Sequence, residues 1–205
     1  MIKNIVFDLG RVLLSYDPAA MLSEMYDSRK ADALMDTVYL SDKWSDLDKG
    51  ELTFAGAVEY FSALRPDLRQ EVENVFSAGT WEKLLYPLED TVALLRGLKK
   101  SGYMIYFLSN FSKEGFDIIS PKRDFFKLAD GWVISAHVRV IKPDPAIYEL
   151  LLEKYSLAPA ETVFIDDLPG NVAAAEGLGI HAVLFENAAD CREKLERIIA
   201  KEGRG

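Results

Sequence analysis

The sequence predicts an α/β fold, in which helices cover both faces of a parallel β-sheet and a helical segment is inserted after the first strand. Two observations carry this prediction. From about Pro87 onward, apolar runs of strand length alternate with segments of helical length, a pattern typical of parallel sheets covered by helices. Between Pro18 and Pro87, by contrast, apolar residues recur at helical spacing and no strand pattern is evident.

The first strand is expected at residues 2–7, where a continuous apolar run is typical of a strand buried on both faces. The helical region follows it directly. Thr53 is expected to cap one of its helices. The apolar face of that helix is marked by Phe54, Ala57, Val58 and Phe61.

The remaining elements alternate along the chain. Helices are expected at residues 89–100, 145–155, 170–177 and 188–201, and strands at 103–108, 131–135, 162–165 and 180–185. Asp144 is expected to cap the helix that starts at Pro145, because proline is favoured at the first helical position. Since the helical region lies between the first and second core strands, we expect residues 17–85 to form a helical cap subdomain. The α/β core would then comprise residues 1–16 and 86–205.

The composition excludes several classes of partner. The 205 residues carry a net charge of −9, whereas nucleic acids and anionic membranes both require positive charge on the protein. No segment has the length and apolarity of a transmembrane span and no secretory signal follows Met1, so we expect a cytoplasmic protein. The single cysteine, Cys191, excludes an internal disulfide and a cysteine zinc cluster. We expect packing or surface roles for it and for His137 and His181.

Polar or acidic residues stand where three of the expected strands end. Asp8 follows the first strand, Ser109 the second, and Asp166 and Asp167 the strand at 162–165. Ligands of open α/β sheets bind beyond the carboxyl ends of the strands, so these side chains should converge on one crevice. Carboxylates brought together repel one another unless a cation offsets their charge. The sequence therefore predicts a metal-containing active site.

Taken in order, four short motifs resemble the signature motifs of the haloacid dehalogenase superfamily, whose members are mostly phosphatases. The first is Asp8 in Phe-Asp-Leu-Gly-Arg-Val-Leu, and the second is Ser109 in Leu-Ser-Asn. The third is Lys142 in Lys-Pro-Asp-Pro, and the fourth is the pair Asp166 and Asp167. The resemblance covers nearly the whole chain and implies a Rossmann-like core with a helical cap.

The resemblance implies that Asp8 attacks phosphorus and forms an aspartyl-phosphate, which water then hydrolyses. A carboxylate with an ordinary pKa of about 3.9 is ionised at neutral pH without help. Mg²⁺ is the implied cofactor. Its expected ligands are Asp8, the backbone carbonyl of Gly10 and Asp167, with Asp166 acting through water.

Positive charge and hydrogen-bond donors should hold the phosphate. Lys142 is expected to pair with the nucleophile and with the phosphoryl oxygens, while Ser109 and the backbone amides of Leu9 and Asn110 hold the remaining oxygens. Arg11 stands next to the nucleophile. It either binds a substrate anion or points into solvent.

One position departs from the family pattern. Most phosphatases of the superfamily have a second aspartate two residues after the nucleophile, which protonates the leaving oxygen, whereas this chain has Gly10 there. One explanation is a leaving group that needs little protonation, such as that of a sugar 1-phosphate. The Asp-Leu-Gly-x-Val motif resembles a sugar-phosphate phosphatase subgroup. Another explanation is that a water or a cap residue replaces the acid, with Asp46, Asp48 and Lys49 as candidates.

Two other functions are compatible with Gly10. True 2-haloacid dehalogenases use an aspartate nucleophile without the second aspartate, because halide leaves unprotonated, although they normally carry an aromatic residue at this position. A catalytically weak member could instead bind a phosphorylated ligand or a protein partner. The retained nucleophile argues against such a binding module, because its carboxylate repels an anionic ligand. The leading expectation is an Mg²⁺-dependent phosphatase acting on a small phosphorylated metabolite.

Overall fold

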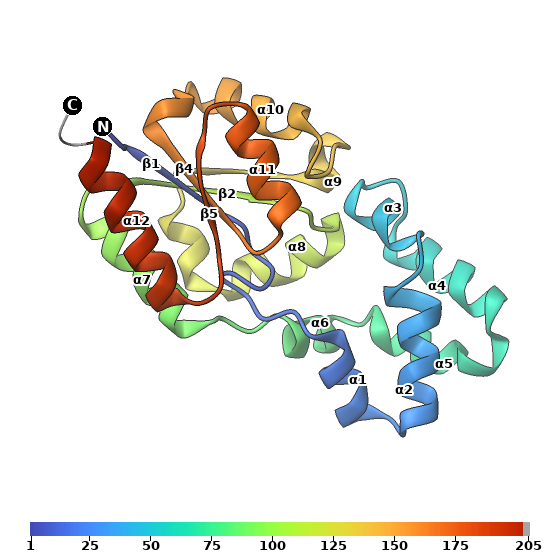
Figure 1. Cartoon of the computed structure of the whole chain (residues 1–205). Helices are drawn as coiled ribbons and strands as arrows, with labels where there is room; N and C mark the ends of the chain where they lie inside the picture. Colours follow the sequence, from blue (N-terminus) through green and yellow to red (C-terminus); the bar gives the residue numbers. More distant parts are fainter. Residues whose placement is uncertain (203–205) are drawn as a thin grey trace.

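A parallel β-sheet forms the centre of the protein, of which a computed structural model describes residues 1–202 (Figure 1). The five strands lie in the order β3-β2-β1-β4-β5, and β1 pairs with both β2 and β4. The three strands whose ends carry the polar residues are therefore neighbours, and the predicted α/β class is confirmed. The strands are β1 (Asn4–Phe7), β2 (Met104–Ser109), β3 (Gly131–Ile134), β4 (Thr162–Asp166) and β5 (His181–Leu184).

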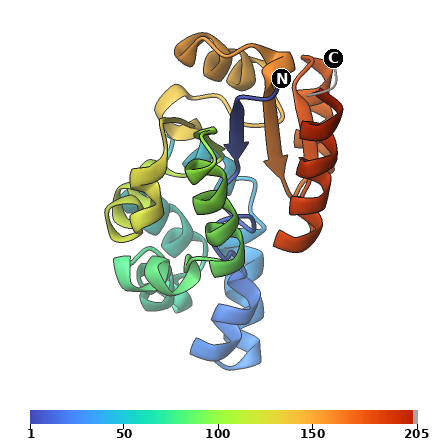
Figure 2. The same ribbon diagram turned by 90° about the vertical axis from the view of Figure 1, so that its left-hand side faces the viewer.

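Helices cover both faces of this sheet (Figures 1 and 2). Alternate strand residues point to opposite faces, so Ile5 and Phe107 pack on one side and Val6 and Phe164 on the other. The helices of the first face include α7 (Glu89–Lys100) and α12 (Ala188–Glu202), and those of the second are α10 (Pro145–Tyr155) and α11 (Pro169–Gly177). Within residues 1–202, no helix is long and apolar enough to cross a membrane.

Local sequence signals account for several helix ends. The Asp144 side chain accepts a hydrogen bond from the amide of Ala146 at 3.0 Å, and the Thr53 side chain accepts one from Gly56 at 3.1 Å. Both predicted caps are confirmed. Two short helices, α8 (Lys113–Ile119) and α9 (Ser135–Val138), were not expected. They span two turns or fewer, which is too short for a helical period to show in the sequence.

A block of helices occupies the chain between β1 and β2. Its apolar side chains, including those of Leu22, Phe61 and Trp81, join the first-face core in one continuous cluster. We call this block the cap. The division into subdomains at residues 17–85 stays a prediction. The cap helices are α1 (Pro18–Met25), α2 (Ser28–Leu34), α3 (Trp44–Asp48), α4 (Phe54–Leu64), α5 (Arg69–Val75) and α6 (Ala78–Leu84), and a π-helical turn (Met35–Tyr39) follows α2.

The chain enters and leaves the cap at the same place. The Ser15 hydroxyl donates to the carbonyl of Leu84 at 2.5 Å and accepts from the amide of Tyr86 at 2.9 Å. The amide of Leu88 donates to the carbonyl of Leu13 at 2.9 Å. The two connecting segments are therefore bonded side by side.

The far side of the cap contacts the core through α3. The Ser135 hydroxyl at the start of α9 donates to the carbonyl of Asp48 at 2.5 Å. Gly50 follows with a left-handed φ of 67°, and a Cβ at this position would lie 2.5 Å from the carbonyl oxygen of Ala136. Only glycine suits both the backbone angle and this close approach. The end of α3 is thus fixed against α9.

Replacement of Gly50 by alanine is expected to destabilise the protein by about 1–3 kcal/mol, because the added Cβ meets backbone and strains the left-handed conformation. Gly97→Ala is the matched control. This glycine lies inside α7, where a Cβ meets nothing within 4 Å, so alanine should stabilise by about 0.5–1 kcal/mol. Urea denaturation of both variants measures the difference, and an unchanged midpoint for Gly50→Ala would contradict the close approach.

Candidate functional site

A cavity of about 350 Å³ lies between the carboxyl ends of the strands and the cap. Its core side is polar and its cap side is largely aromatic. The structure brings most of the predicted site residues to this cavity. The lining residues from the core side include Asp8, Gly10, Arg11, Ser109, Asn110, Lys142, Asp167 and Asn171.

Asp8 directly continues β1, because its amide donates to the carbonyl of Ile165 at 2.9 Å. The chain then reverses in a tight turn, in which Arg11 adopts a left-handed φ of 57° and the amide of Leu14 donates to the carbonyl of Leu9 at 2.8 Å. Within residues 1–202, the amides of Leu9 and Asn110 have no protein acceptor. These two donors therefore remain available to a ligand near Asp8.

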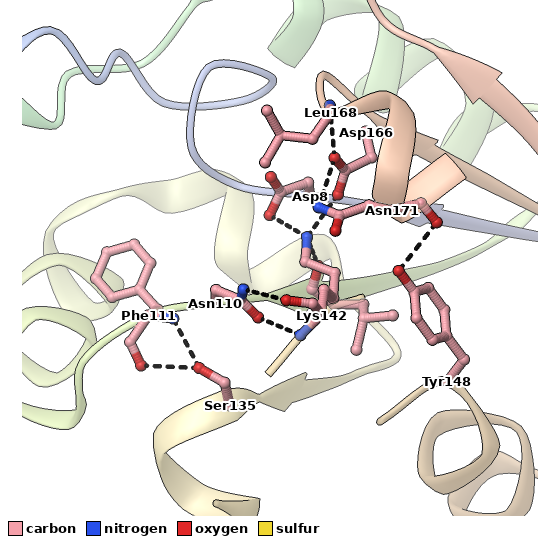
Figure 3. Close-up of polar contacts among 10 residues, drawn as sticks. Asp8, Asn110, Phe111, Ser135, Lys142, Tyr148, Asp166, Leu168 and Asn171 are labelled. Atoms are coloured by element: carbon pink, nitrogen blue, oxygen red, sulfur yellow. Dashed lines mark hydrogen bonds and ion pairs between the residues drawn. The ribbon is translucent and has the colours of Figure 1, made fainter. Parts of the chain in front are cut away.

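Lys142 forms the centre of a buried ion-pair group (Figure 3). Its Nζ lies 2.9 Å from Oδ1 of Asp8 and 2.6 Å from Oδ2 of Asp166, and it donates to the carbonyl of Leu108 at 3.0 Å. The side chain of Lys142 is almost completely buried. All three donors of the ammonium group are thus directed to oxygen atoms, as burial of a charge requires.

The side chain of Asn110 holds the backbone of Lys142 in place. Its Nδ2 donates to the carbonyl of Lys142 at 3.0 Å, and its Oδ1 accepts from the amide of Lys142 at 2.8 Å (Figure 3). Nothing in the sequence indicated this pairing, because the two residues lie far apart along the chain. Asn110 therefore positions the lysine through its side chain, while its backbone amide has no acceptor among residues 1–202.

Asp166 is occupied by protein contacts on both carboxylate oxygens. Oδ2 accepts from Lys142, whereas Oδ1 accepts from the amide of Leu168 and from Nδ2 of Asn171, each at 2.9 Å (Figure 3). The residue is completely buried. Its carboxylate orients the neighbouring groups and has little free coordination capacity.

The charges of the site affect one another's protonation. Burial raises the pKa of Asp8 to about 6, while Lys142 acts in the opposite direction and Asp166 adds to the rise. For Lys142, burial lowers the pKa, but the carboxylates of Asp8 and Asp166 more than offset it, so its pKa lies above the ordinary value. At neutral pH the site therefore keeps an ionised carboxylate beside a protonated amine.

Three carboxylates are close enough to share a cation. Asp8, Asp166 and Asp167 each offer an oxygen within 4.8 Å of the others. Burial, and then the charge of Asp166, raises the pKa of Asp167. A divalent cation would relieve this repulsion, and an all-oxygen donor set suits Mg²⁺. The residues present therefore fit the metal that the family resemblance implies.

Arg11 lies at the mouth of the cavity and is not directed simply into solvent. Its Nε donates to the carbonyl of Tyr16 at 3.2 Å, and its guanidinium lies 5.8 Å from the centre of the Tyr16 ring. Its Nη1 is 3.9 Å from a carboxylate oxygen of Asp167. More than half of the side chain is exposed, so these contacts leave the guanidinium accessible from the cavity.

The three cap candidates for the missing acid are placed differently. Asp48 lines the cavity, and burial, followed by the charge of Asp8, raises the pKa of its carboxyl to about 7. Asp46 lies on the same helix but forms an ion pair with Lys43 at 2.7 Å. Neither Asp46 nor Lys49 lines the cavity. Gly10 does line it, and a Cβ there would meet nothing within 4 Å.

The aromatic wall of the cavity was not expected from the sequence. Tyr39 and Trp44 lie with ring centres 4.7 Å apart, and Trp44 stacks on Trp81 at 6.2 Å. Trp81 in turn lies 6.1 Å from Phe111 of the core. Trp81 Nε1 and the Ser112 hydroxyl, both in lining residues, have no partner within residues 1–202. Two of the three tryptophans of the chain, Trp44 and Trp81, lie in the cap, but periodicity alone does not distinguish a cavity wall from a core.

The chain is similar to several enzymes of known name, two of which are phosphatases. It is 28% identical over 215 residues to a D-ribitol-5-phosphate phosphatase of Bacteroides thetaiotaomicron, with 97% of this chain and 99% of the relative covered. It is 27% identical over 192 residues to the sesquiterpene phosphatase astK of Aspergillus oryzae, covering 93% and 94%. The drimenol cyclase drtB of Aspergillus calidoustus is 29% identical over 202 residues, which are 97% of this chain but only 37% of that protein.

The fold is also found in solved structures. A HAD family enzyme of Bacteroides thetaiotaomicron, in complex with magnesium and inorganic phosphate, superposes with a TM-score of 0.73 at 22% identity, covering 91% of this chain and 95% of the other. The family model for haloacid dehalogenase-like hydrolases matches residues 2–179. The chain therefore belongs to the haloacid dehalogenase-like hydrolase family.

Proposed function

We propose that the protein is an Mg²⁺-dependent phosphatase that hydrolyses a small phosphorylated metabolite through an aspartyl-phosphate on Asp8. One observation carries the proposal. The Asp8 carboxylate faces the cavity, 2.9 Å from a buried lysine amine and beside Asp166 and Asp167. Two relatives that are covered almost completely carry phosphatase names, which supports the same reaction class.

In this mechanism an oxygen of Asp8 attacks phosphorus, and the bond from phosphorus to the ester oxygen breaks. Water then hydrolyses the aspartyl-phosphate and restores the carboxylate. Lys142 is proposed to stabilise the negative charge on the phosphoryl oxygens, which Ser109 and the amides of Leu9 and Asn110 bind. Arg11 is a further candidate for binding a substrate anion at the cavity mouth.

Asp8, Asp167 and the carbonyl of Gly10 are the proposed ligands of Mg²⁺. When bound, the cation would neutralise the carboxylates and withdraw charge from the transferring phosphoryl group. Asp166 is proposed to act through water or through its contact with Lys142, because both of its oxygens already accept hydrogen bonds.

Two substrate classes receive support. The Asp-Leu-Gly-x-Val motif and the resemblance to a D-ribitol-5-phosphate phosphatase favour a sugar or polyol phosphate. Sugar 1-phosphates come first if no other residue replaces the acid that Gly10 lacks. The aromatic wall and the resemblance to a sesquiterpene phosphatase favour the phosphate of an apolar alcohol instead. Dehalogenation is disfavoured, because Gly10 leaves open the space that an aromatic residue normally fills in those enzymes.

Asp8→Asn should lower turnover of p-nitrophenyl phosphate with Mg²⁺ by at least about a thousandfold, because the amide cannot act as the nucleophile. Release of nitrophenolate by the variant and the wild type measures the loss, and circular dichroism confirms that both are folded. Comparable turnover by the two proteins would overturn the role of Asp8. Chloride release from 2-chloropropionate by a wild type inactive on phosphate esters would instead indicate a dehalogenase.

Mg²⁺ should raise the melting temperature of the wild type, because the cation offsets repulsion among the carboxylates. At a concentration about 100 times Kd, the expected stabilisation is about 2.7 kcal/mol, or several degrees. Asp167→Asn should abolish most of this shift. Asp124→Asn, which alters an exposed carboxylate paired with Arg96, should keep it. Equal shifts in both variants would exclude Asp167 as a ligand, and EDTA should remove the wild-type shift together with activity.

A substrate panel separates the two classes. If sugar 1-phosphates are the substrates, their kcat/KM should exceed that of the matching 6-phosphates by at least about tenfold. If the aromatic wall binds an apolar alcohol portion of the substrate, the kcat/KM for farnesyl monophosphate should exceed that for both sugar phosphates. A preference for 6-phosphates would contradict the hypothesis that the leaving group compensates for Gly10.

A further inference from the structure

One of the three carboxyl groups that line the cavity within residues 1–202 comes from the cap. Asp48 stands at the end of α3 in the cap, whereas Asp8 and Asp167 belong to the core. Asp8 and Asp167 already have parts in the proposed mechanism as nucleophile and metal ligand. Asp48 is the remaining carboxylate among the described lining residues, and it has no assigned role.

The Asp48 carboxyl is also unpaired. Among residues 1–202, no lysine, arginine or histidine forms an ion pair with it, and no donor forms a hydrogen bond with its side-chain oxygens. Asp46, two positions earlier, is instead bound to Lys43. A carboxyl group that lines a cavity without a protein partner is free to exchange a proton with a ligand there.

The backbone around Asp48 is fixed by the core. Its carbonyl accepts from the Ser135 hydroxyl at 2.5 Å, and Gly50 packs directly on Ala136. The Ser135 hydroxyl also accepts from the amide of Phe111, in the loop that follows β2 (Figure 3). The backbone that carries the acid is thus fixed relative to the floor of the site, which favours the positioning that proton transfer in a transition state requires.

We propose that Asp48 is the general acid and base of the reaction and replaces the side chain that Gly10 lacks. The inference rests on the proposed phosphatase function. As Asp8 attacks and the bond from phosphorus to the ester oxygen breaks, the Asp48 carboxyl gives its proton to that oxygen, which leaves as an alcohol. The Asp48 carboxylate then takes a proton from the water that attacks phosphorus, and the bond between phosphorus and Asp8 breaks. Asp48 ends protonated as it began, so the protons balance.

Two phosphate esters of similar size and apolarity test this role. Nitrophenolate leaves p-nitrophenyl phosphate without a proton, whereas the alkoxide of p-nitrobenzyl phosphate must be protonated. Asp48→Asn should lower kcat/KM for the benzyl ester by about 10²–10⁴-fold and that for the phenyl ester by less than about threefold. Because kcat/KM reports only the steps up to alcohol release, this comparison isolates the acid step.

The base step has its own signature. Without a base, hydrolysis of the aspartyl-phosphate should limit turnover, so Asp48→Asn should show a burst of nitrophenolate approaching one equivalent per enzyme, followed by a slow phase. Asp46→Asn is the matched control on the same helix and should leave both esters and the burst as in the wild type.

Several outcomes would overturn the inference. Equal losses of kcat/KM for both esters in Asp48→Asn would indicate a structural role. An unchanged kcat/KM for the benzyl ester would exclude Asp48 as the general acid. A wild type that hydrolyses the phenyl ester but not the benzyl ester would contradict the acid role while leaving the phosphatase in place. A folded, Mg²⁺-loaded wild type that hydrolyses neither would overturn the phosphatase proposal itself.

Discussion

The buried ammonium group of Lys142 is the interaction on which the rest of the site depends. It separates Asp8 from Asp166, two carboxylates that would otherwise repel each other with little water between them. Loss of one partner from such a buried group typically costs about 3–5 kcal/mol, because an uncompensated charge remains. The strand order supports this arrangement, since β1 and β4 are neighbours and bring the two carboxylates together. Sheet topology and charge balance are therefore two aspects of one constraint.

The core and the cap contribute different kinds of side chain to one cavity. The core supplies charged side chains, backbone amides and the left-handed turn at Arg11, most of them at strand ends, while Lys142 is held through Asn110. The cap supplies aromatic rings to the cavity wall, and apolar surroundings strengthen the interactions of nearby charges. The shared apolar cluster, which runs from the sheet into the cap, makes both parts of the cavity depend on the same packing.

The sequence was sufficient for the fold class and for the core side of the site. Long apolar runs revealed the strands, and α7 and α10 have the expected bounds because proline, glycine and Asp144 mark their ends. Polar residues at the ends of three strands predicted that these side chains meet in one cavity. The hydrogen bonds from Asn110 to Lys142 and the position of Asp48 at the cavity could not be predicted from the sequence. Both depend on contacts between segments distant in sequence, and α9, which fixes Asp48, spans only Ser135–Val138.

The two hydrogen-bonded segments that connect the cap to the core have a consequence for how the cavity can change. Because the chain enters and leaves the cap through two segments that are hydrogen-bonded to each other, these segments form a single connection to the core. The cap meets the core again through α3 and Ser135, whereas β1 is held between β2 and β4 in the sheet. The cap can therefore accumulate substitutions that reshape the cavity without moving the nucleophile. Substrate preference can then diverge while the reaction is retained.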